Sequence, residues 1–222
     1  MEMFRVHLKK GFLVEQDSEI TNPSQLNPIS GFDDVIEKIL LKKQYSEEQI
    51  NKIKDFIRKS GVGHLEISPI LNASGMALDD KVIIDPKVFQ YTIARLLYIL
   101  FHEIAHAYQY KKYGKTKKWS MYFNEQSIED SARFMKYLEN IADDFALRKL
   151  REFVKSGLLT QDEIKNIYPV YSNISLNYFI KFIEFFRKII EERGITEQQQ
   201  INDLLYRYAK VGNMEILKQY TK

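Results

Sequence analysis

The sequence predicts an α+β fold that is predominantly helical, with one small β-hairpin or sheet. Apolar residues recur at helical spacing over most of the chain, whereas strand-like segments occur only at HLEISPI and GMALDDKVIID, residues 64–70 and 75–85. Of the 222 residues, 45% are hydrophobic, which is enough for one sizeable core. No cysteine is present, so the core must hold without disulfides and the chain offers no thiolate for metal binding or catalysis.

Residues 1–60 are predicted to form an N-terminal, mostly helical segment. A strand over residues 4–8 is followed by a loop and then by a helix over residues 33–42. A second helix begins at Ser46 and ends near Gly61. The Ser46 hydroxyl can cap its first turn while the side chain of Gln49 reaches back to the backbone of Ser46.

Residues 61–156 are predicted to form the central core. The two strand-like segments come first, and the second is expected to be a hairpin that turns at Asp79-Asp80. Asp85-Pro86 then begins a helix, with aspartate as N-cap and proline at the first helical position, and nothing in the pattern breaks this helix before Gly114. A second long helix is expected from about residue 127 to residue 154.

Residues 157–222 are predicted to form a helical C-terminal region that packs on the core. Its helices should begin near four polar residues, Thr160, Asn173, Thr196 and Asn213. In NYFIKFIEFFRKIIEERG, residues 177–194, aromatic and isoleucine side chains recur at helical spacing and charged residues occupy the other face. This stripe favours packing against the core over binding to a membrane or a partner. Substrate selection by this region is a secondary hypothesis.

Charge and hydropathy limit the classes of partner. A net charge of +3 is mild for this length, which argues against a dedicated nucleic-acid-binding protein. The densest basic cluster, KKYGKTKKW at residues 111–119, is expected to be a solvated loop after a helix. No apolar run approaches the ~20 residues of a membrane span, and the N-terminal residues lack a secretion-signal pattern. We therefore expect a cytoplasmic protein.

The stretch LLYILFHEIAHAYQY, residues 96–110, places two histidines and a glutamate in an apolar, aromatic run. Because burying an unpaired polar group costs roughly 1–3 kcal/mol, something should compensate for them. On a helix, His102 and His106 project from one face, where both imidazoles can reach a single zinc ion. Glu103 lies beside them, which suits a base that takes a proton from a metal-activated water. This spacing is the His-Glu-x-x-His pattern of zinc peptidases.

A catalytic zinc site needs a third protein ligand, and here it should be a carboxylate. The four histidines lie at positions 7, 64, 102 and 106, so none follows the motif. In YLENIADDFALRKL, residues 137–150, Glu139 and Asp143 share a helical face. Glu139 would bind the metal, and Asp143 would accept a hydrogen bond from a motif histidine. The rival third ligand is Glu125 in FNEQSIED, where Glu125 and Glu129 have the same spacing.

The motif HEIAH, followed on a second helix by Glu-x-x-Ala-Asp, resembles the gluzincin-type zinc metallopeptidases. Among them, the layout is most similar to the small intracellular ImmA/IrrE-type family, over about residues 61–155. The resemblance implies a zincin-like core and a site of five residues: zinc ligands His102, His106 and Glu139, base Glu103, and orienting residue Asp143. The gap between His106 and Glu139 is longer than in thermolysin-like enzymes, a spacing that Glu125 nearly meets.

The predicted activity is hydrolysis of a peptide bond by a zinc-dependent endopeptidase, with Zn2+ as cofactor and a protein or peptide as substrate. The strand that begins at Gly75 could pair with an extended substrate, as the resemblance also implies. Two alternatives remain, because a fold does not determine a function. One is a catalytically silent zincin-fold protein with a binding or regulatory role, and the other is a metal hydrolase of a non-peptide substrate. During hydrolysis a negative charge develops on the oxygen of the attacked carbonyl. Four tyrosines could stabilise this oxyanion, namely Tyr108, Tyr110, Tyr137 and Tyr171.

Overall fold

The computed structural model describes most of the chain between residues 45 and 205. The described residues are 37, 40–41, 45–59, 62, 64–70, 73–78, 81–113, 127–169, 173–197, 200–201 and 203–205, with the side chains of 111–113 excepted. Some predicted features lie outside them: the strand over residues 4–8, most of the helix over residues 33–42, the turn at Asp79-Asp80, the basic cluster's side chains, Glu125, Tyr171 and the helix near Asn213.

The strands form one mixed sheet in the order β1-β3-β2. The central strand β3 (Lys81–Ile84) runs parallel to β1 (His64–Ile67) and antiparallel to β2 (Gly75–Leu78). The antiparallel pair is the hairpin that the sequence predicts. Three of the four residues of β3 are buried, as expected for a central strand. Among the described strands, β2 therefore lies at one edge of the sheet, on the side away from β1.

Helix α2 (Glu47–Lys59) begins where the sequence predicts. The Ser46 hydroxyl accepts a hydrogen bond from the Gln49 backbone N–H at 3.2 Å, and Gln49 Oε1 accepts one from the Ser46 N–H at 2.9 Å. This reciprocal pair is a capping box. Phe56 of α2 packs edge-on against Phe101 with ring centroids 4.9 Å apart, which joins α2 to the helix that carries the histidines.

The helix predicted to begin at Asp85 is interrupted, so the prediction of a single helix was wrong. The Asp85 carboxylate caps a turn as expected, but that turn is a short 3-10 helix, η2 (Pro86–Gln90). Tyr91 is extended, and the long helix α3 (Ile93–Tyr113) begins only after Thr92. The Thr92 hydroxyl lies 3.4 Å from a backbone N–H in the first turn of α3. Helical periodicity does not reveal a break of this kind, because threonine can cap as well as continue a helix.

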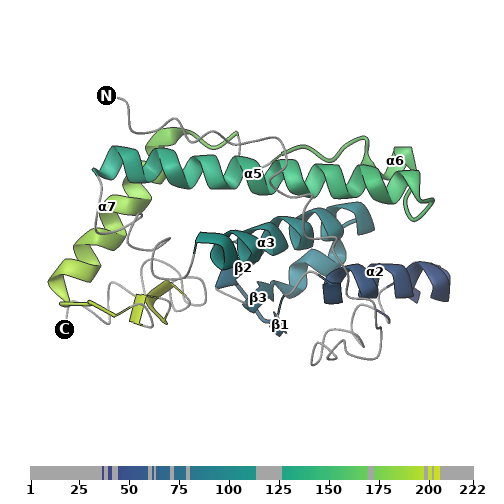
Figure 1. Cartoon of the computed structure of the whole chain (residues 1–222), viewed down its shortest axis with the longest axis horizontal. Helices are drawn as coiled ribbons and strands as arrows, with labels where there is room; N and C mark the ends of the chain where they lie inside the picture. Colours follow the sequence, from purple (N-terminus) through teal and green to yellow (C-terminus); the bar gives the residue numbers. More distant parts are fainter. Residues whose placement is uncertain are drawn as a thin grey trace.

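Helix α5 (Ile128–Lys155) is the second long helix of the prediction. The Ser127 hydroxyl accepts a hydrogen bond from the Asp130 backbone N–H at 3.0 Å and so caps it. Its buried side chains, Leu138 and Phe145 among them, line the face that packs on α3. The two helices lie one above the other in Figure 1, with the sheet on the other side of α3. The helix α3 thus lies between the sheet and α5.

The described helices of the C-terminal region pack on α5. Helix α6 (Gln161–Ile164) has the expected Thr160 cap but spans a single turn. Helix α7 (Leu176–Glu192) begins three residues later than predicted and crosses one end of α5 (Figure 1). Its apolar stripe faces the core, and a guanidinium nitrogen of Arg187 donates to the buried Ser131 hydroxyl of α5 at 2.7 Å. Beyond Thr196, residues 200–201 and 203–205 are helical.

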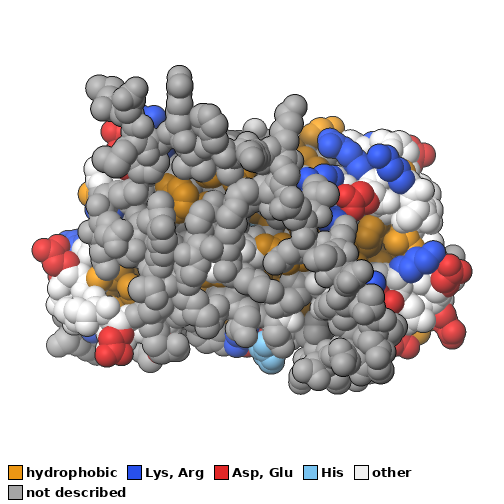
Figure 2. All heavy atoms as spheres, in the orientation of Figure 1, with side chains coloured by type: hydrophobic (Ala, Val, Ile, Leu, Met, Phe, Trp, Pro, Cys, Tyr) orange, Lys and Arg blue, Asp and Glu red, His pale blue; other side chains and the backbone are white. Residues whose placement is uncertain are grey.

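The described elements confirm an α+β fold that is predominantly helical, with a small three-stranded sheet. Figure 2 shows acidic and basic side chains intermixed on the described part of the face in view. Neighbouring charges pair along the helices, as Lys52 does with Glu48 at 2.8 Å. Such exposed pairs contribute little to stability. None of the described helices combines the length and the apolar character that crossing a membrane would require.

Candidate metal centre

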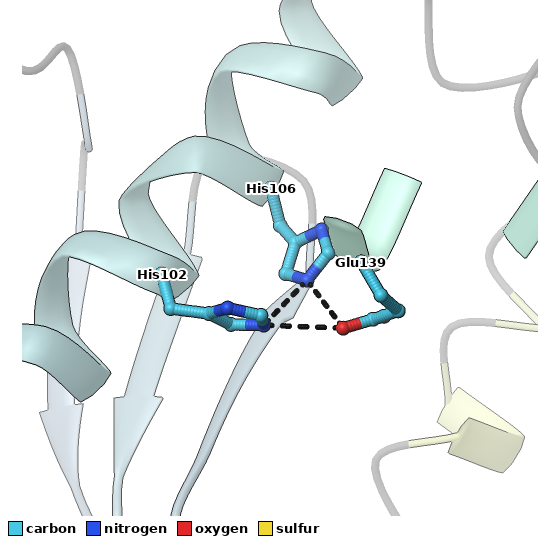
Figure 3. A group of neighbouring side chains, drawn as sticks. All are labelled: His102, His106 and Glu139. Carbon is cyan, nitrogen blue, oxygen red and sulfur yellow. Dashed lines mark hydrogen bonds and ion pairs between the residues drawn. The ribbon is translucent and has the colours of Figure 1, made fainter. Parts of the chain in front are cut away.

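Two helices bring the predicted metal ligands together. Helix α3 carries His102 and His106 one turn apart, and both point toward Glu139 of α5 (Figure 3). Glu139 Oε2 lies 3.1 Å from His102 Nε2 and 3.3 Å from His106 Nε2, and the two imidazole nitrogens are 3.0 Å apart. One ligand atom from each residue thus converges on one place, and the three residues form a group that could hold a metal ion.

The electrostatics of this group favour a cation. Burial lowers the pKa of His102, but the hydrogen-bonded carboxylates of Asp143 and Glu139 outweigh burial and raise this pKa to about 10. Glu139 is also desolvated, yet the neighbouring imidazoles hold its pKa well below its usual range. A positive charge at this place would offset the charge of the buried carboxylates. Two imidazole nitrogens and a carboxylate oxygen are also a donor set that suits zinc.

Asp143 lies where the sequence prediction places it. Its Oδ1 is 2.9 Å from His102 Nδ1, and its side chain is 1% exposed. The Tyr98 hydroxyl donates a hydrogen bond to the same carboxylate oxygen. The sequence analysis missed Tyr98, although its position four residues before His102 on one helix face is a usable signal. Together the two side chains fix the orientation of the His102 ring.

Gln109 is the second residue that the sequence analysis missed. Its Oε1 lies 2.9 Å from His106 Nδ1, and its Nε2 donates to the Leu138 carbonyl at 2.9 Å. The side chain is buried between α3 and α5. Its spacing of three residues from His106 could have indicated a contact, but the bond to α5 depends on tertiary packing.

Glu103 is buried against the edge strand rather than within the ligand group. It is 3% exposed, and its side chain passes directly over Gly75 of β2. A Cβ atom added to Gly75 would lie 2.7 Å from Glu103 Cγ and 2.9 Å from Glu103 Oε1, which is closer than such atoms can approach. The glycine that leads the hairpin therefore leaves the space in which the Glu103 carboxylate lies.

A cleft opens over the ligand group and Glu103. Its volume is ≈ 190 Å³, smaller than the roughly 300–1,000 Å³ of pockets that enclose a whole small ligand. Its polar end is formed by His102, His106, Glu103 and Glu139. Its remaining wall is mostly apolar and includes Gly75, Met76, Tyr110, Met135, Phe182 and Leu205. Residues from β2, α3, α5, α7 and the segment after α7 therefore meet at one site.

The tyrosines considered for the oxyanion differ in position. Tyr110 lines the cleft, whereas Tyr108 packs edge-on against Phe145 with ring centroids 5.8 Å apart. Burial raises the pKa of Tyr137, which the structure does not place in the cleft wall. A further phenol, the half-exposed Tyr178 of α7, has a pKa that is raised by partial burial and by the negative charge of Glu139.

Glu129 of the rival segment is not part of the site. Glu129 is 59% exposed on its side chain and pairs with Arg133 at 2.6 Å, and Glu125 lies outside the described residues.

Comparisons of the chain with protein-family models, curated proteins and solved structures find no match. The chemistry of this site must therefore be inferred from its own residues.

Proposed function

We propose that the protein is a zinc-dependent endopeptidase of the gluzincin type, with a zincin-like core similar in layout to the ImmA/IrrE-type family. One observation carries this proposal: His102, His106 and Glu139 converge at a cleft in which Glu103 lies beside an edge strand. Each of these features has a place in the hydrolysis of a peptide held along that strand. The roles of the individual residues follow from their positions.

His102, His106 and Glu139 would hold zinc through one atom each. Bound zinc supplies a Lewis acid that polarises a carbonyl and makes a water molecule acidic. Glu103 is not one of the three donors, and its carboxylate lines the same cleft. It would accept the proton of the attacking water and then deliver that proton to the amine that leaves. Burial keeps bulk water from competing for this proton transfer.

The number of donors favours a catalytic site over a structural one. A structural zinc site uses four protein ligands, whereas a catalytic site uses three and keeps one position open. Among the described residues, the group that could hold a metal comprises two histidines and one glutamate. The cleft reaches this group, so a reacting bond could approach it.

The cleft favours an extended peptide with apolar side chains. Its volume of ≈ 190 Å³ accommodates a side chain or two rather than a whole small ligand. Among the described strands, β2 has a partner on one side only, and its other edge could pair with the backbone of an extended substrate. Met76, Met135 and Phe182 would then contact substrate side chains on either side of the bond that is cleaved.

Digestion of a mixed peptide library tests the proposed function. We expect the zinc-loaded protein to cleave internal bonds beside apolar residues, and removal of zinc with a chelator should abolish cleavage. Mass spectrometry of the products gives the cleaved bonds. Zinc binding without cleavage of any peptide would instead favour the binding or regulatory role, and turnover of non-peptide esters or amides alone would favour the other hydrolase class.

A Gly75→Ala variant should lose activity without losing zinc. The new Cβ would lie 2.7 Å from Glu103 Cγ, so the base must move, and a displacement of this size can lower the rate by about 100-fold. Steady-state kinetics on a cleaved peptide and the zinc content of the same preparation check this. Ser74→Ala, which adds no Cβ, is the matched control. Unchanged activity in Gly75→Ala would show that Glu103 does not need its present position.

A further inference from the structure

The side-chain amide of Gln109 connects the metal centre to helix α5, because it contacts both His106 and the Leu138 carbonyl. We propose that Gln109 is a positioning residue that holds His106 in the tautomer with an unprotonated Nε2. This role rests on the proposed metal-dependent function. It differs from the role of Glu103, because Gln109 acts on the metal site only through His106.

The orientation of the Gln109 amide follows from its two contacts. Its Nε2 is 2.9 Å from the Leu138 carbonyl, and its Oε1 is 2.9 Å from His106 Nδ1. A backbone carbonyl can only accept a hydrogen bond, so the amide NH2 group must face Leu138. The amide oxygen must then face the imidazole. The backbone of α5 thereby removes the usual ambiguity between the oxygen and nitrogen of a glutamine side chain.

The same reasoning places the proton on His106. The amide oxygen can only accept, so His106 Nδ1 must donate and therefore carries hydrogen. In a neutral imidazole, a proton on Nδ1 leaves the lone pair on Nε2. That Nε2 is the atom 3.0 Å from His102 Nε2 and 3.3 Å from Glu139 Oε2. Gln109 thus prepares His106 as a metal ligand before any metal binds.

Gln109 also couples the ligand set to the packing of α3 on α5. Leu138, whose carbonyl it binds, directly precedes Glu139. A shift of α5 along α3 would therefore move the third ligand and break the amide contact together. The partner of His102 is the charged Asp143, whereas a glutamine is neutral. Gln109 can therefore fix His106 without adding a further negative charge near Glu139 and Asp143.

The zinc affinities of two Gln109 variants test the proposal on the full-length protein. Gln109→Leu removes the acceptor and should weaken zinc binding by about 10–100-fold, as loss of a ligand's hydrogen-bond partner typically does. Gln109→Glu keeps an oxygen that accepts from His106 Nδ1 but loses the donor to the Leu138 carbonyl, so it should restore part of the affinity that Gln109→Leu loses. Competition with a chromophoric zinc chelator gives each Kd. The control Gln49→Leu removes a glutamine that lies 3.4 Å from the Gly157 carbonyl, outside the site, and should leave the Kd unchanged.

The outcomes separate this proposal from the proposed function. Equal zinc affinity in wild type and Gln109→Leu would overturn the role of Gln109 alone, and a wild-type protein that binds no zinc would overturn both. Equal weakening in Gln109→Leu and Gln109→Glu would show that the oxygen facing His106 Nδ1 does not set the zinc affinity, and would also overturn the role of Gln109. If Gln109→Leu does not fold, long-range 1H–15N NMR of the metal-free wild type tests the proposal instead, because it shows which nitrogen of His106 carries the proton. A proton on His106 Nδ1 supports the assignment, and its absence overturns it.

Discussion

A Glu103→Gln variant is expected to lose about 10²–10⁴-fold in peptide hydrolysis while keeping its zinc. Glutamine has the same shape as glutamate but cannot accept the proton of the attacking water, and general-base catalysis contributes a factor of this size. The metal should stay because Glu103 is not one of the three converging donors. The Glu103 side chain packs closely over Gly75, so a substitution that keeps its shape should leave its position unchanged. The measurements are kcat/KM on a cleaved peptide and the zinc content of the same sample.

The matched control for this experiment is Glu129→Gln. Glu129 lies in the first turn of the long helix that carries Glu139, but it is exposed and pairs with Arg133. Its replacement should leave both kcat/KM and zinc content unchanged. If Glu103→Gln cleaves peptides as fast as wild type, Glu103 is not the base. If Glu103→Gln loses its zinc instead, the residue is a ligand and the assignment of three donors is wrong.

A Glu139→Ala variant is expected to weaken zinc binding by more than about 100-fold, beyond the loss expected when only a ligand's hydrogen-bond partner is removed. It deletes one of three converging donors and the only carboxylate among them. Two neutral imidazoles would remain to bind a divalent cation in a buried site, without the charge that compensates it. Chelator competition on the purified variant measures the change in Kd.

Glu125→Ala should be measured in the same assay as Glu139→Ala, because Glu125 is the rival third ligand in the sequence. We expect Glu125→Ala to bind zinc as tightly as wild type. The opposite pattern, with zinc lost in Glu125→Ala and retained in Glu139→Ala, would transfer the ligand role to Glu125. Circular dichroism of the metal-free variants separates loss of a ligand from loss of the fold.

Local signals in the sequence were enough for most of the helices and for the spacing within each pair of site residues. Ser46 with Gln49, and Ser127 before α5, are caps whose chemistry lies within four residues. The spacing of His102 and His106, and of Glu139 and Asp143, is likewise set by the turn of a helix. The choice of Glu139 over its rival Glu125 rested on the resemblance, and the structure places Glu139 beside both histidines.

Most of the features that the sequence analysis missed depend on contacts between segments that are distant in the chain. One depends on a residue that is compatible with two local structures. Gly75 matters because β2 passes under Glu103, and no local pattern predicts that approach. Gln109 contacts a backbone carbonyl 29 residues further along the chain. The break before α3 arises from Thr92, which can either continue a helix or cap one.

The metal content of the wild-type protein, purified without chelator or added metal, tests the central claim most directly. Elemental mass spectrometry should find close to one zinc ion per chain, because His102, His106 and Glu139 present one converging donor atom each. No zinc, even after reconstitution with excess zinc and removal of the unbound ion, would contradict it. The two buried histidines and Glu139 would then be a hydrogen-bonded polar cluster of the core, and the peptidase proposal would fall with the metal site.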